Sequence, residues 1–280
     1  MNSDVAGLAS GKGHKDENFP VASVLLKREH RAPIMAFYRF ARAADDVADH
    51  PTAGAQEKLD RLADLRRGLD GKGAAEAVAL AQAMRARGLD PIHAHELLDA
   101  FVRDVTINRY ADWDDLIGYC RLSAMPVGRF VLDVHGEDRA IWPLSDALCA
   151  ALQVINHLQD CAKDYRALDR VYLTAEALAA TGATAEDLAA DRATPALLGT
   201  VRLMASQTEA LLRTSAPFAL TIRDRRLGIE VAIIQRLAED LTRRLKIRDP
   251  LSEPVHHSTA EAAWLAMRAM LGQMFARRKR

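Results

Sequence analysis

Hydrophobic residues recur along this chain at spacings of three and four, and runs that alternate apolar and polar residues are scarce. That spacing follows the 3.6-residue turn of an amphipathic α-helix, whereas a half-buried strand alternates. Ala, Leu, Arg and Glu, which favour helices, are abundant. The pattern predicts an all-α protein. Helices are expected at about residues 20–30, 33–49, 56–70, 74–87, 92–109, 112–135, 145–167, 195–214, 217–247 and 259–278.

The chain shows no shift in composition that marks a domain boundary and no internal repeat. Residues 1–16 are rich in Gly, Ser and Lys and are expected to be a disordered leader. Residues 17–280 are then expected to form a single all-α domain. Within it, residues 168–194 are the one long irregular candidate.

Three local signals mark helix starts and breaks. Pro33 suits the first turn of a helix, where its missing N–H costs nothing. Ser145 and Asp146 form an N-cap and first turn. Pro126 interrupts the pattern of 112–135, so a kink with a freed backbone carbonyl is expected there.

Composition narrows the class of protein further. With 280 residues, 49% of them hydrophobic, the chain can bury a large core. Lys and Arg number 38 and so do Asp and Glu, so no net field favours nucleic acid as a partner. The start lacks a basic stretch followed by an apolar run, and three cysteines without C-x-x-C spacing fit a reducing compartment. We expect a cytoplasmic protein, with any contact to the inner membrane face peripheral.

Two aspartate pairs are the most informative feature. Asp45 and Asp49 are four residues apart, and so are Asp160 and Asp164. A four-residue step places both carboxylates on one face of a helix, where like charges repel. Both pairs fall near the ends of predicted helices, where the helix dipole disfavours negative charge. Two such placements against local preference predict a cation between the pairs.

Other polar residues continue these two faces deeper into the helices. Tyr38 and Arg42 precede the first pair at helical spacing, and Asp46 can reach the same place from the side. Gln153 and Asn156 precede the second pair in the same way. A solvated surface face is the alternative, but such faces mix Lys and Glu, and these helices are otherwise apolar. The stripes are therefore expected to face a cavity.

The residue types indicate which ion would be held. Carboxylate oxygens without His or Cys favour hard cations, and Mg²⁺ completes its shell with water and phosphate oxygens. A diphosphate held between the two acidic clusters is expected. Arg42 and Arg170 are the best basic groups for it, and Tyr172 could add a hydroxyl.

Three ordered segments resemble a known family. Residues 37–49 (FYRFARAADDVAD) and 156–164 (NHLQDCAKD), with RVYL at 170–173, resemble the two aspartate-rich motifs of the squalene/phytoene synthase family. Residues 119–128 (YCRLSAMPVG) lie where that family has its third signature. The resemblance extends over about 17–275.

This resemblance implies a single-domain bundle of the class I isoprenoid synthase type with a central hydrophobic cavity. It also implies Mg²⁺-dependent ionisation of a prenyl diphosphate. The departures at 17–23 and 123–126 are similar to the bacterial branch of the family found in hopanoid biosynthesis. In that branch the substrate would be presqualene diphosphate, and water rather than NADPH would quench the cation. An upstream presqualene diphosphate synthase and a downstream desaturase or reductase would then be partners.

The candidate residues follow from the motifs and the stripes together. Those proposed for catalysis are Tyr38, Arg42, Ser123, Gln153 and Asn156; for substrate binding Arg42, Tyr119, Gly128, Arg170 and Tyr172; and for metal binding Asp45, Asp46, Asp49, Asp160 and Asp164. Two other functions remain open at this point. One is a head-to-head condensing enzyme that makes presqualene diphosphate, squalene or phytoene, and the other is a non-catalytic assembly protein of the same fold.

Overall fold

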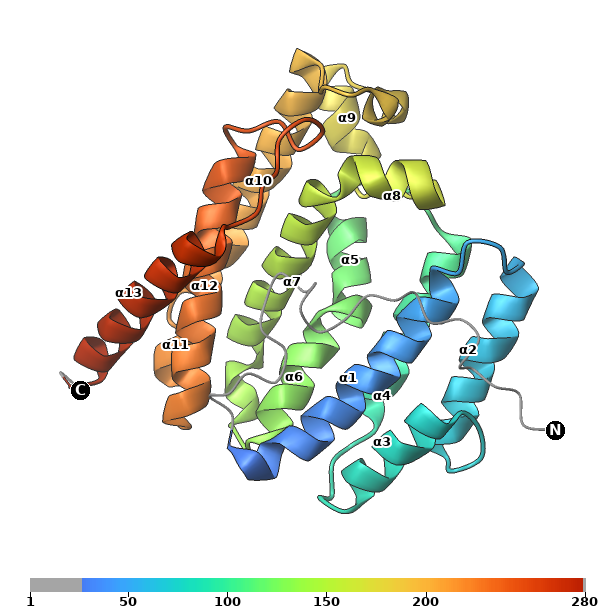
Figure 1. Ribbon diagram of the computed structural model, residues 1–280, viewed down its shortest axis with the longest axis vertical. Helices are drawn as coiled ribbons and strands as arrows, with labels where there is room; N and C mark the ends of the chain where they lie inside the picture. The colour runs from blue at the N-terminus through green and yellow to red at the C-terminus, as the bar shows by residue number, and fades with distance from the viewer. Residues whose placement is uncertain (1–26, 279–280) are drawn as a thin grey trace.

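Amphipathic helices cross one another at shallow angles and bury their apolar faces in one shared core (Figure 1). The computed structural model describes residues 27–278, so the expected leader at 1–16 lies outside the described residues. In that part of the chain the elements are α1 (Arg28–Ala48), α2 (Ala55–Leu69), α3 (Ala75–Arg85), α4 (Ile92–Thr106), α5 (Trp113–Ser123), α6 (Met125–Val134), η2 (Arg139–Ile141), α7 (Trp142–Gln159), α8 (Cys161–Leu168), α9 (Ala175–Thr181), η3 (Ala185–Ala189), α10 (Pro195–Ser215), α11 (Phe218–Thr221), α12 (Arg225–Leu245) and α13 (Thr259–Arg278).

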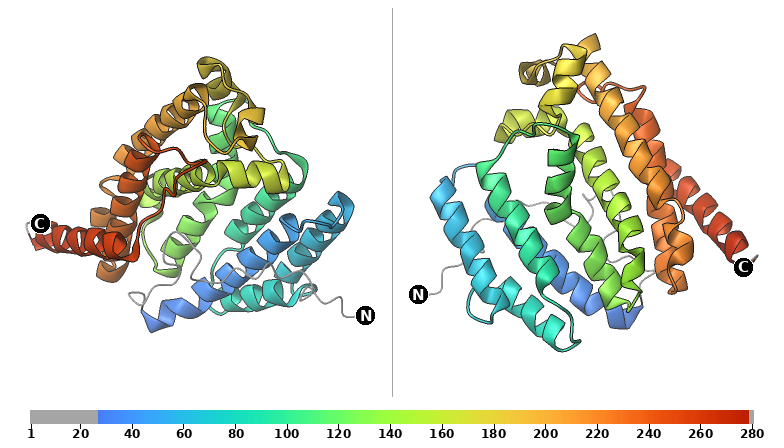
Figure 2. Two further views of the ribbon diagram at one scale, coloured as in Figure 1. Left: turned by 45° about the horizontal axis from the view of Figure 1, so that its top comes forward. Right: turned by 180° about the vertical axis from the view of Figure 1, so that it is seen from behind.

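The helices form two flanks around a central group. α2 and α3 lie on one side and α10 to α13 on the other, with α1 and α4 to α7 between them (Figures 1 and 2). α8 lies across the ends of the central helices. Packing of α10 on α7, of α1 on α3 and of α12 on α13 joins the layers. At the centre, the rings of Phe37 and Phe130 stack with their centroids 4.2 Å apart. The all-α prediction is confirmed.

Pro33 does not open a helix. α1 begins five residues earlier at Arg28 and passes through Pro33, which is buried. The expected boundary is therefore wrong. Pro33 lies just beyond the first turn, so only one backbone hydrogen bond is lost, and the buried side chains of Ile34, Phe37 and Phe40 hold the helix on the core.

Two long predicted helices are each divided. The expected helix at 112–135 breaks at Ala124, whose ψ of -45° and φ of -113° leave helical geometry, and Pro126 lies in the first turn of α6. The expected helix at 145–167 begins earlier, at Trp142, so Ser145 and Asp146 are not its cap. It is interrupted at Asp160, and α8 begins at the next residue, Cys161.

The expected helix at 20–30 lies mostly outside the described residues, and its last residues belong to α1. The other expectations hold with smaller changes. The segment 168–194 contains the short helices α9 and η3. The expected helix at 217–247 is α11 followed by α12, and the Asp224 carboxylate caps α12 by accepting from the backbone N–H of Arg226 and Leu227. Among the described residues, no helix combines the length and apolar character that a membrane crossing requires. The three cysteines are free thiols.

Candidate active site

A cavity of about 810 Å³ opens between the ends of the central helices. Its lining combines a group of aspartates with apolar residues, among them Leu97, Phe101 and Val127, and we call the part lined by the aspartates the mouth. Val127 is 40% exposed because it faces this space. The cavity gathers these residues that the sequence singled out: Tyr38, Arg42, Asp45, Asp46, Asp49, Tyr119, Ser123, Gln153, Asn156, Asp160, Asp164, Arg170 and Tyr172.

Gly128 is not among the lining residues. A Cβ atom at this position would lie 2.5 Å from Cys149 Sγ and 2.5 Å from Ser145 Oγ. Real Cβ atoms essentially never make contacts that short, so a larger residue would force the side chains of Ser145 and Cys149 to move, and glycine allows the close approach of α6 to α7. The structure therefore places Gly128 in helix packing and not beside the cavity.

The two acidic pairs line the cavity from different elements, which we call its two walls: α1 for Asp45 and Asp49, and the joint between α7 and α8 for Asp160 and Asp164. Asp49 is the C-cap of α1, so the expected placement at a helix end is correct for the first pair. The second pair differs, because Asp160 occupies the joint between α7 and α8 and Asp164 lies in the first turn of α8. Negative charge is favourable at a helix start, so the expected conflict with the helix dipole is wrong for Asp164.

Two arginines form ion pairs with the acidic residues of the mouth. Arg42 pairs with acids of its own helix, at 2.9 Å to Asp45 and 2.7 Å to Asp46. Arg170, which is only 8% exposed, pairs with Asp49 at 2.6 Å. Its guanidinium also donates to the backbone carbonyl of Asp104 at 3.2 Å. Arg170 thus connects the segment after α8 to the ends of α1 and α4.

A charge on one wall of the mouth affects the pKa of a carboxyl group on the other wall. Burial raises the pKa of the Asp164 carboxyl to about 7, and the charges of Asp160 and Asp49 add to this effect. Asp49 belongs to the opposite wall, so the two clusters share one negative field. Such a field is relieved by a cation between the walls.

Asp104 is a member of the site that the sequence analysis missed. It lies on α4, accepts a hydrogen bond from Tyr119 OH at 3.0 Å, and its Oδ1 is buried without a hydrogen-bond partner. Burial raises the pKa of Asp104 to about 7. Leu97, Phe101 and Asp104 follow helical spacing, an apolar stripe that ends in an acid, as on α1. This spacing is the feature of the sequence from which Asp104 could have been identified as a residue of the site.

His157 is the second missed residue. Its ring stacks on Tyr172 with centroids 3.4 Å apart and an interplanar angle of 10°. Gln153 Nε2 lies 3.1 Å from His157 Nε2, and because the amide nitrogen can only donate, this ring nitrogen accepts. Burial lowers the pKa of His157 to about 3, with Arg170 adding to the shift, so the ring is neutral. Its position four residues after Gln153 placed it on the same stripe.

The donor set at the mouth fits Mg²⁺. It consists of carboxylate oxygens, and the pKa of one of these carboxyls, Asp164, is raised by burial and by the neighbouring charges of Asp160 and Asp49. In residues 27–278, three ligand atoms of acidic or histidine side chains come within 4.8 Å of one another only at a different place. An ion at the mouth would therefore need further oxygens from water or substrate. Mg²⁺ commonly binds in that way, through one or two carboxylates plus phosphate.

The raised pKa values predict a pH dependence of stability. The folded protein holds protons on Asp104 and Asp164 up to about pH 7, whereas the unfolded chain releases them near its ordinary value of 3.8. The free energy of unfolding therefore falls as the pH rises through this window. We expect a loss of about 2 kcal/mol for each group between about pH 5 and pH 8 in the absence of divalent ions.

Urea denaturation of the wild type and of Asp104→Asn measures this loss. The variant should lose less stability over the same pH range, whereas Asp60→Asn, on the exposed side of α2, should follow the wild type. An equal pH dependence of stability in Asp104→Asn and the wild type would contradict the raised pKa of Asp104.

Comparison with known proteins adds independent evidence. Residues 12–261 match the Squalene/phytoene synthase family. The chain is 54% identical to the hydroxysqualene synthase of Zymomonas mobilis over 276 residues, which cover 97% of this chain and 93% of that protein. It is 51% identical to the hydroxysqualene synthase of Rhodopseudomonas palustris, over 96% of this chain and 93% of that protein.

Solved structures agree on the architecture. The squalene synthase of Alicyclobacillus acidocaldarius superposes with a TM-score of 0.72 at 31% identity, covering 86% of this chain and 91% of that one. A dehydrosqualene synthase in complex with ligand superposes with a TM-score of 0.74 at 22% identity, covering 96% of this chain and 95% of that one, which supports the fold alone.

Proposed function

The chain belongs to the squalene/phytoene synthase family, and on that premise we propose that it converts presqualene diphosphate and water into hydroxysqualene and diphosphate, with Mg²⁺ as cofactor. The relatives that share about half of its residues over nearly the full length are named hydroxysqualene synthases. The observation that carries the proposal is one cavity with two acidic clusters at its mouth and apolar walls behind them. We further propose that a single domain, 17–280, holds the whole activity, since both clusters belong to one helical bundle.

The first step is cleavage of the bond between carbon and diphosphate oxygen. In the proposed site, Asp45, Asp46 and Asp49 on one wall and Asp160 and Asp164 on the other would hold Mg²⁺ and, with it, the diphosphate end of the substrate. Mg²⁺, when bound, supplies Lewis-acid stabilisation of the charge that develops on the leaving diphosphate. Arg170, held by Asp49, adds a fixed positive charge at the same place.

The second step is capture of the carbocation by water. The electron pair of the broken bond leaves with diphosphate, and the cation remains in the apolar part beside Leu97, Phe101 and Val127. Water then forms the new carbon–oxygen bond and gives up one proton to the released diphosphate, which leaves the alcohol. No electrons are exchanged, so NADPH is not required.

A small polar group inside the cavity is suited to hold that water. Ser123 Oγ is buried and has no hydrogen-bond partner, so it is available to a water in the cavity. The bond between Gln153 Nε2 and His157 turns the Gln153 carbonyl away from His157, and stacking on Tyr172 keeps the ring in place. We propose that Ser123, Gln153 and Asn156 orient the water and that His157 positions Gln153.

Product analysis in ¹⁸O-labelled water tests the proposed function. Presqualene diphosphate with Mg²⁺ and no NADPH should give hydroxysqualene that carries the label, because the hydroxyl oxygen comes from solvent. His157→Leu should release more unhydroxylated hydrocarbon at the expense of the alcohol, since Gln153 would lose its fixed orientation.

The other functions have distinct outcomes in the same assay. Squalene formed only when NADPH is added, or turnover of two simpler prenyl diphosphates, would establish a condensing enzyme. No turnover of any prenyl diphosphate would favour the assembly protein. In the proposed function, a presqualene diphosphate synthase supplies the substrate and a desaturase or reductase consumes the product.

A membrane contact is proposed for α13. Six of its side chains are large, apolar and at least 36% exposed: Trp264, Met267, Met270, Leu271, Met274 and Phe275. The chain ends in four basic residues, 277–280, although Arg277 turns inward and donates to the carbonyls of Ala219 and Ile222. An apolar helix face beside basic residues suits the surface of an anionic bilayer, from the cytoplasmic side.

Cosedimentation with vesicles tests this contact. The protein should bind vesicles that contain anionic lipid, and a Leu271→Ser, Phe275→Ser double variant should bind several-fold more weakly because buried apolar area is lost. Ile247→Ser is the matched control, since Ile247 is 76% exposed but lies outside α13. Equal binding by the double variant and the wild type would rule the contact out.

A further inference from the structure

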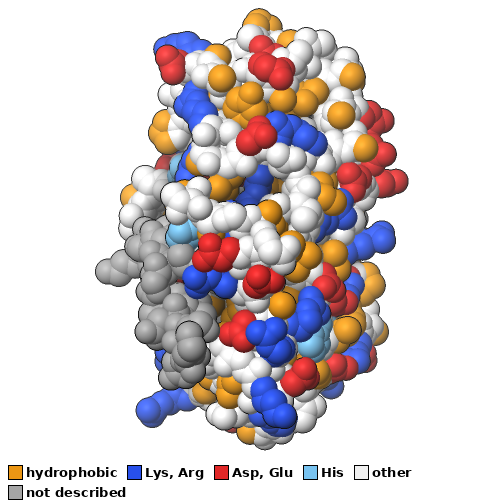
Figure 3. Space-filling view, turned by 90° about the vertical axis from the view of Figure 1, so that its right-hand side faces the viewer, with side chains coloured by type: hydrophobic (Ala, Val, Ile, Leu, Met, Phe, Trp, Pro, Cys, Tyr) orange, Lys and Arg blue, Asp and Glu red, His pale blue; other side chains and the backbone are white. Residues whose placement is uncertain are grey.

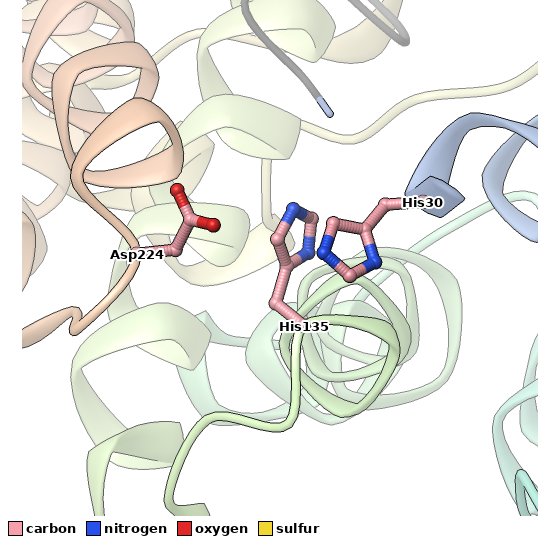
Figure 4. A group of neighbouring side chains, drawn as sticks. All are labelled: His30, His135 and Asp224. Atoms are coloured by element: carbon pink, nitrogen blue, oxygen red, sulfur yellow. The ribbon is translucent and has the colours of Figure 1, made fainter. Parts of the chain in front are cut away.

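Three side chains meet at the end of the bundle that lies away from the acidic mouth (Figure 4). His30 lies in the first turn of α1, His135 is the C-cap of α6, and Asp224 is the N-cap of α12. One ligand atom of each lies within 4.8 Å of the others. Since Asp45 is fifteen residues after His30 on the same helix, about 22 Å separate this group from the mouth.

Hydrogen bonds orient His135 and Asp224 so that one donor atom of each is not used by the backbone. His135 Nδ1 lies 2.8 Å from the carbonyl of Val131, which can only accept, so the proton is on Nδ1 and Nε2 keeps its lone pair. Asp224 Oδ1 accepts from the backbone of α12, which leaves Oδ2. Metal-binding histidines and carboxylates are commonly fixed in this way by a second partner.

The backbone around Asp224 is fixed as well. The buried carboxylate of Glu137 accepts from the backbone N–H of Arg223 at 2.9 Å and of Asp224 at 2.8 Å. The end of α6 and the start of α12 are thereby held at a constant separation. His135 and Asp224 belong to these two segments, so their relative position is set by the fold.

Cationic groups already gather at these donors. Lys27 Nζ lies 2.8 Å from Asp224 Oδ2, and Arg87 Nη1 lies 3.3 Å from His30 Nδ1. Because a guanidinium only donates, His30 Nδ1 has an unprotonated lone pair in this contact. His30 Nε2 lies 3.5 Å from Glu29, whose side chain is 63% exposed. No hydrogen bond joins His30, His135 and Asp224 to one another, so such bonding does not explain their convergence.

We propose that His30, His135 and Asp224 form a binding site for a divalent transition-metal ion, with Zn²⁺ the best match. Two imidazoles and one carboxylate are donors typical of Zn²⁺, whereas Mg²⁺ prefers oxygen alone. The side chains of His30 and Asp224 are only 12% and 9% exposed, so the ion would be shielded from solvent. Water or Glu29 completes a fourth position, and the ion takes the place of Lys27, which is half-exposed and can swing away.

A metal at this position would join the starts of α1 and α12 to the end of α6. These helices come from distant parts of the chain and include both the central group and one flank (Figure 1). Binding to the folded state alone would raise the melting temperature as the ion concentration rises, with a logarithmic dependence above the dissociation constant. The site is therefore a structural clamp, and it is independent of the proposed catalytic function.

Titration of the chelator-treated full-length protein, with Mg²⁺ present throughout, tests the proposal. Co²⁺ should give visible absorption bands that saturate at one equivalent, and Zn²⁺ should displace it and raise the melting temperature. His135→Gln and Asp224→Asn should each lose more than the roughly 10–100-fold in affinity that changes around metal ligands cost. Asn is itself a good N-cap, so Asp224→Asn keeps the start of α12 intact.

His95→Gln is the matched control. His95 also lies beside an arginine, with Nδ1 3.4 Å from Arg66, but belongs to no such group. It should bind Co²⁺ like the wild type. Absence of one-equivalent binding in the wild type, or binding that is undiminished in both His135→Gln and Asp224→Asn, would overturn the proposal. Neither result depends on the activity of the protein with presqualene diphosphate.

Discussion

Replacing one aspartate on either wall of the mouth, by Asp45→Asn or by Asp160→Asn, should lower turnover of presqualene diphosphate by about 1,000-fold or more, since Lewis-acid stabilisation is worth several kcal/mol. Each substitution keeps the size of the side chain and removes its charge. Asp45 and Asp160 both line the cavity, and their side chains are 37% and 39% exposed. An ion and a diphosphate can therefore reach both, and neither wall alone supplies the full set of ligands.

The fold should survive these two substitutions. Arg42 keeps its pair with Asp46 when Asp45 is changed, and Asp160 has a single long contact, 3.8 Å to the exposed Lys163. Helix content by circular dichroism should match the wild type. Asp60→Asn, an exposed aspartate on α2 that accepts a hydrogen bond from Gln56, should keep full activity. Wild-type turnover in either Asp45→Asn or Asp160→Asn would refute the role of that wall.

Arg170→Met should lower the free energy of unfolding by about 3–5 kcal/mol, the usual cost of removing one partner from a buried ion pair. It leaves Asp49 without its 2.6 Å partner and removes the donor to the carbonyls of Ala48 and Asp104. In a chain of this size, a loss of that kind lowers the melting temperature by roughly 10 °C. Turnover should be lost as well, because the fixed positive charge at the mouth is gone.

Two further variants separate charge from geometry at this position. Arg170→Lys keeps the charge but cannot donate in several directions from one plane, so stability should recover only in part. Arg166→Met is the matched control, because exposed Arg166 also donates to two backbone carbonyls, those of Ala189 and Ala190. It should change the free energy of unfolding by less than about 1 kcal/mol. Equal stability of Arg170→Met and Arg166→Met would contradict the account of the mouth.

The location of the site followed from the sequence because helical spacing survives small breaks. Asp160 separates α7 from α8, yet its backbone N–H still bonds to the carbonyl of Asn156, and Asp164 bonds to Asp160. The register of the polar stripe therefore continues through the joint. The stripe on α1 needed no correction, and its residues line the same cavity.

Helical spacing could not predict the interruption at Asp160 or the site residues that come from other helices. Asp104 carries no motif, and only the packing of α4 against α1 brings it to the mouth. Gly128 matched a family signature, but its function in the fold, close packing against α7, depends on a tertiary contact. The helix start at Arg28 depends on the burial of Phe37 and Phe40 in a core built by distant segments.

Outside the part drawn in grey, the face that lies to the right in Figure 1 mixes acidic and basic side chains and is hollowed in its upper half (Figure 3). No single-sign patch of the kind that attracts nucleic acid covers this face. In the lining of the cavity, acidic side chains outnumber basic ones.

Calorimetric titration of the protein with diphosphate, with and without Mg²⁺, tests most directly whether the two walls bind one ligand through the metal. We expect saturable binding only when Mg²⁺ is present, and loss of that binding in Asp45→Asn and in Asp160→Asn alike, because the walls share the ligand. Diphosphate that binds equally well without Mg²⁺, or that binds undiminished after one wall is changed, would contradict the account.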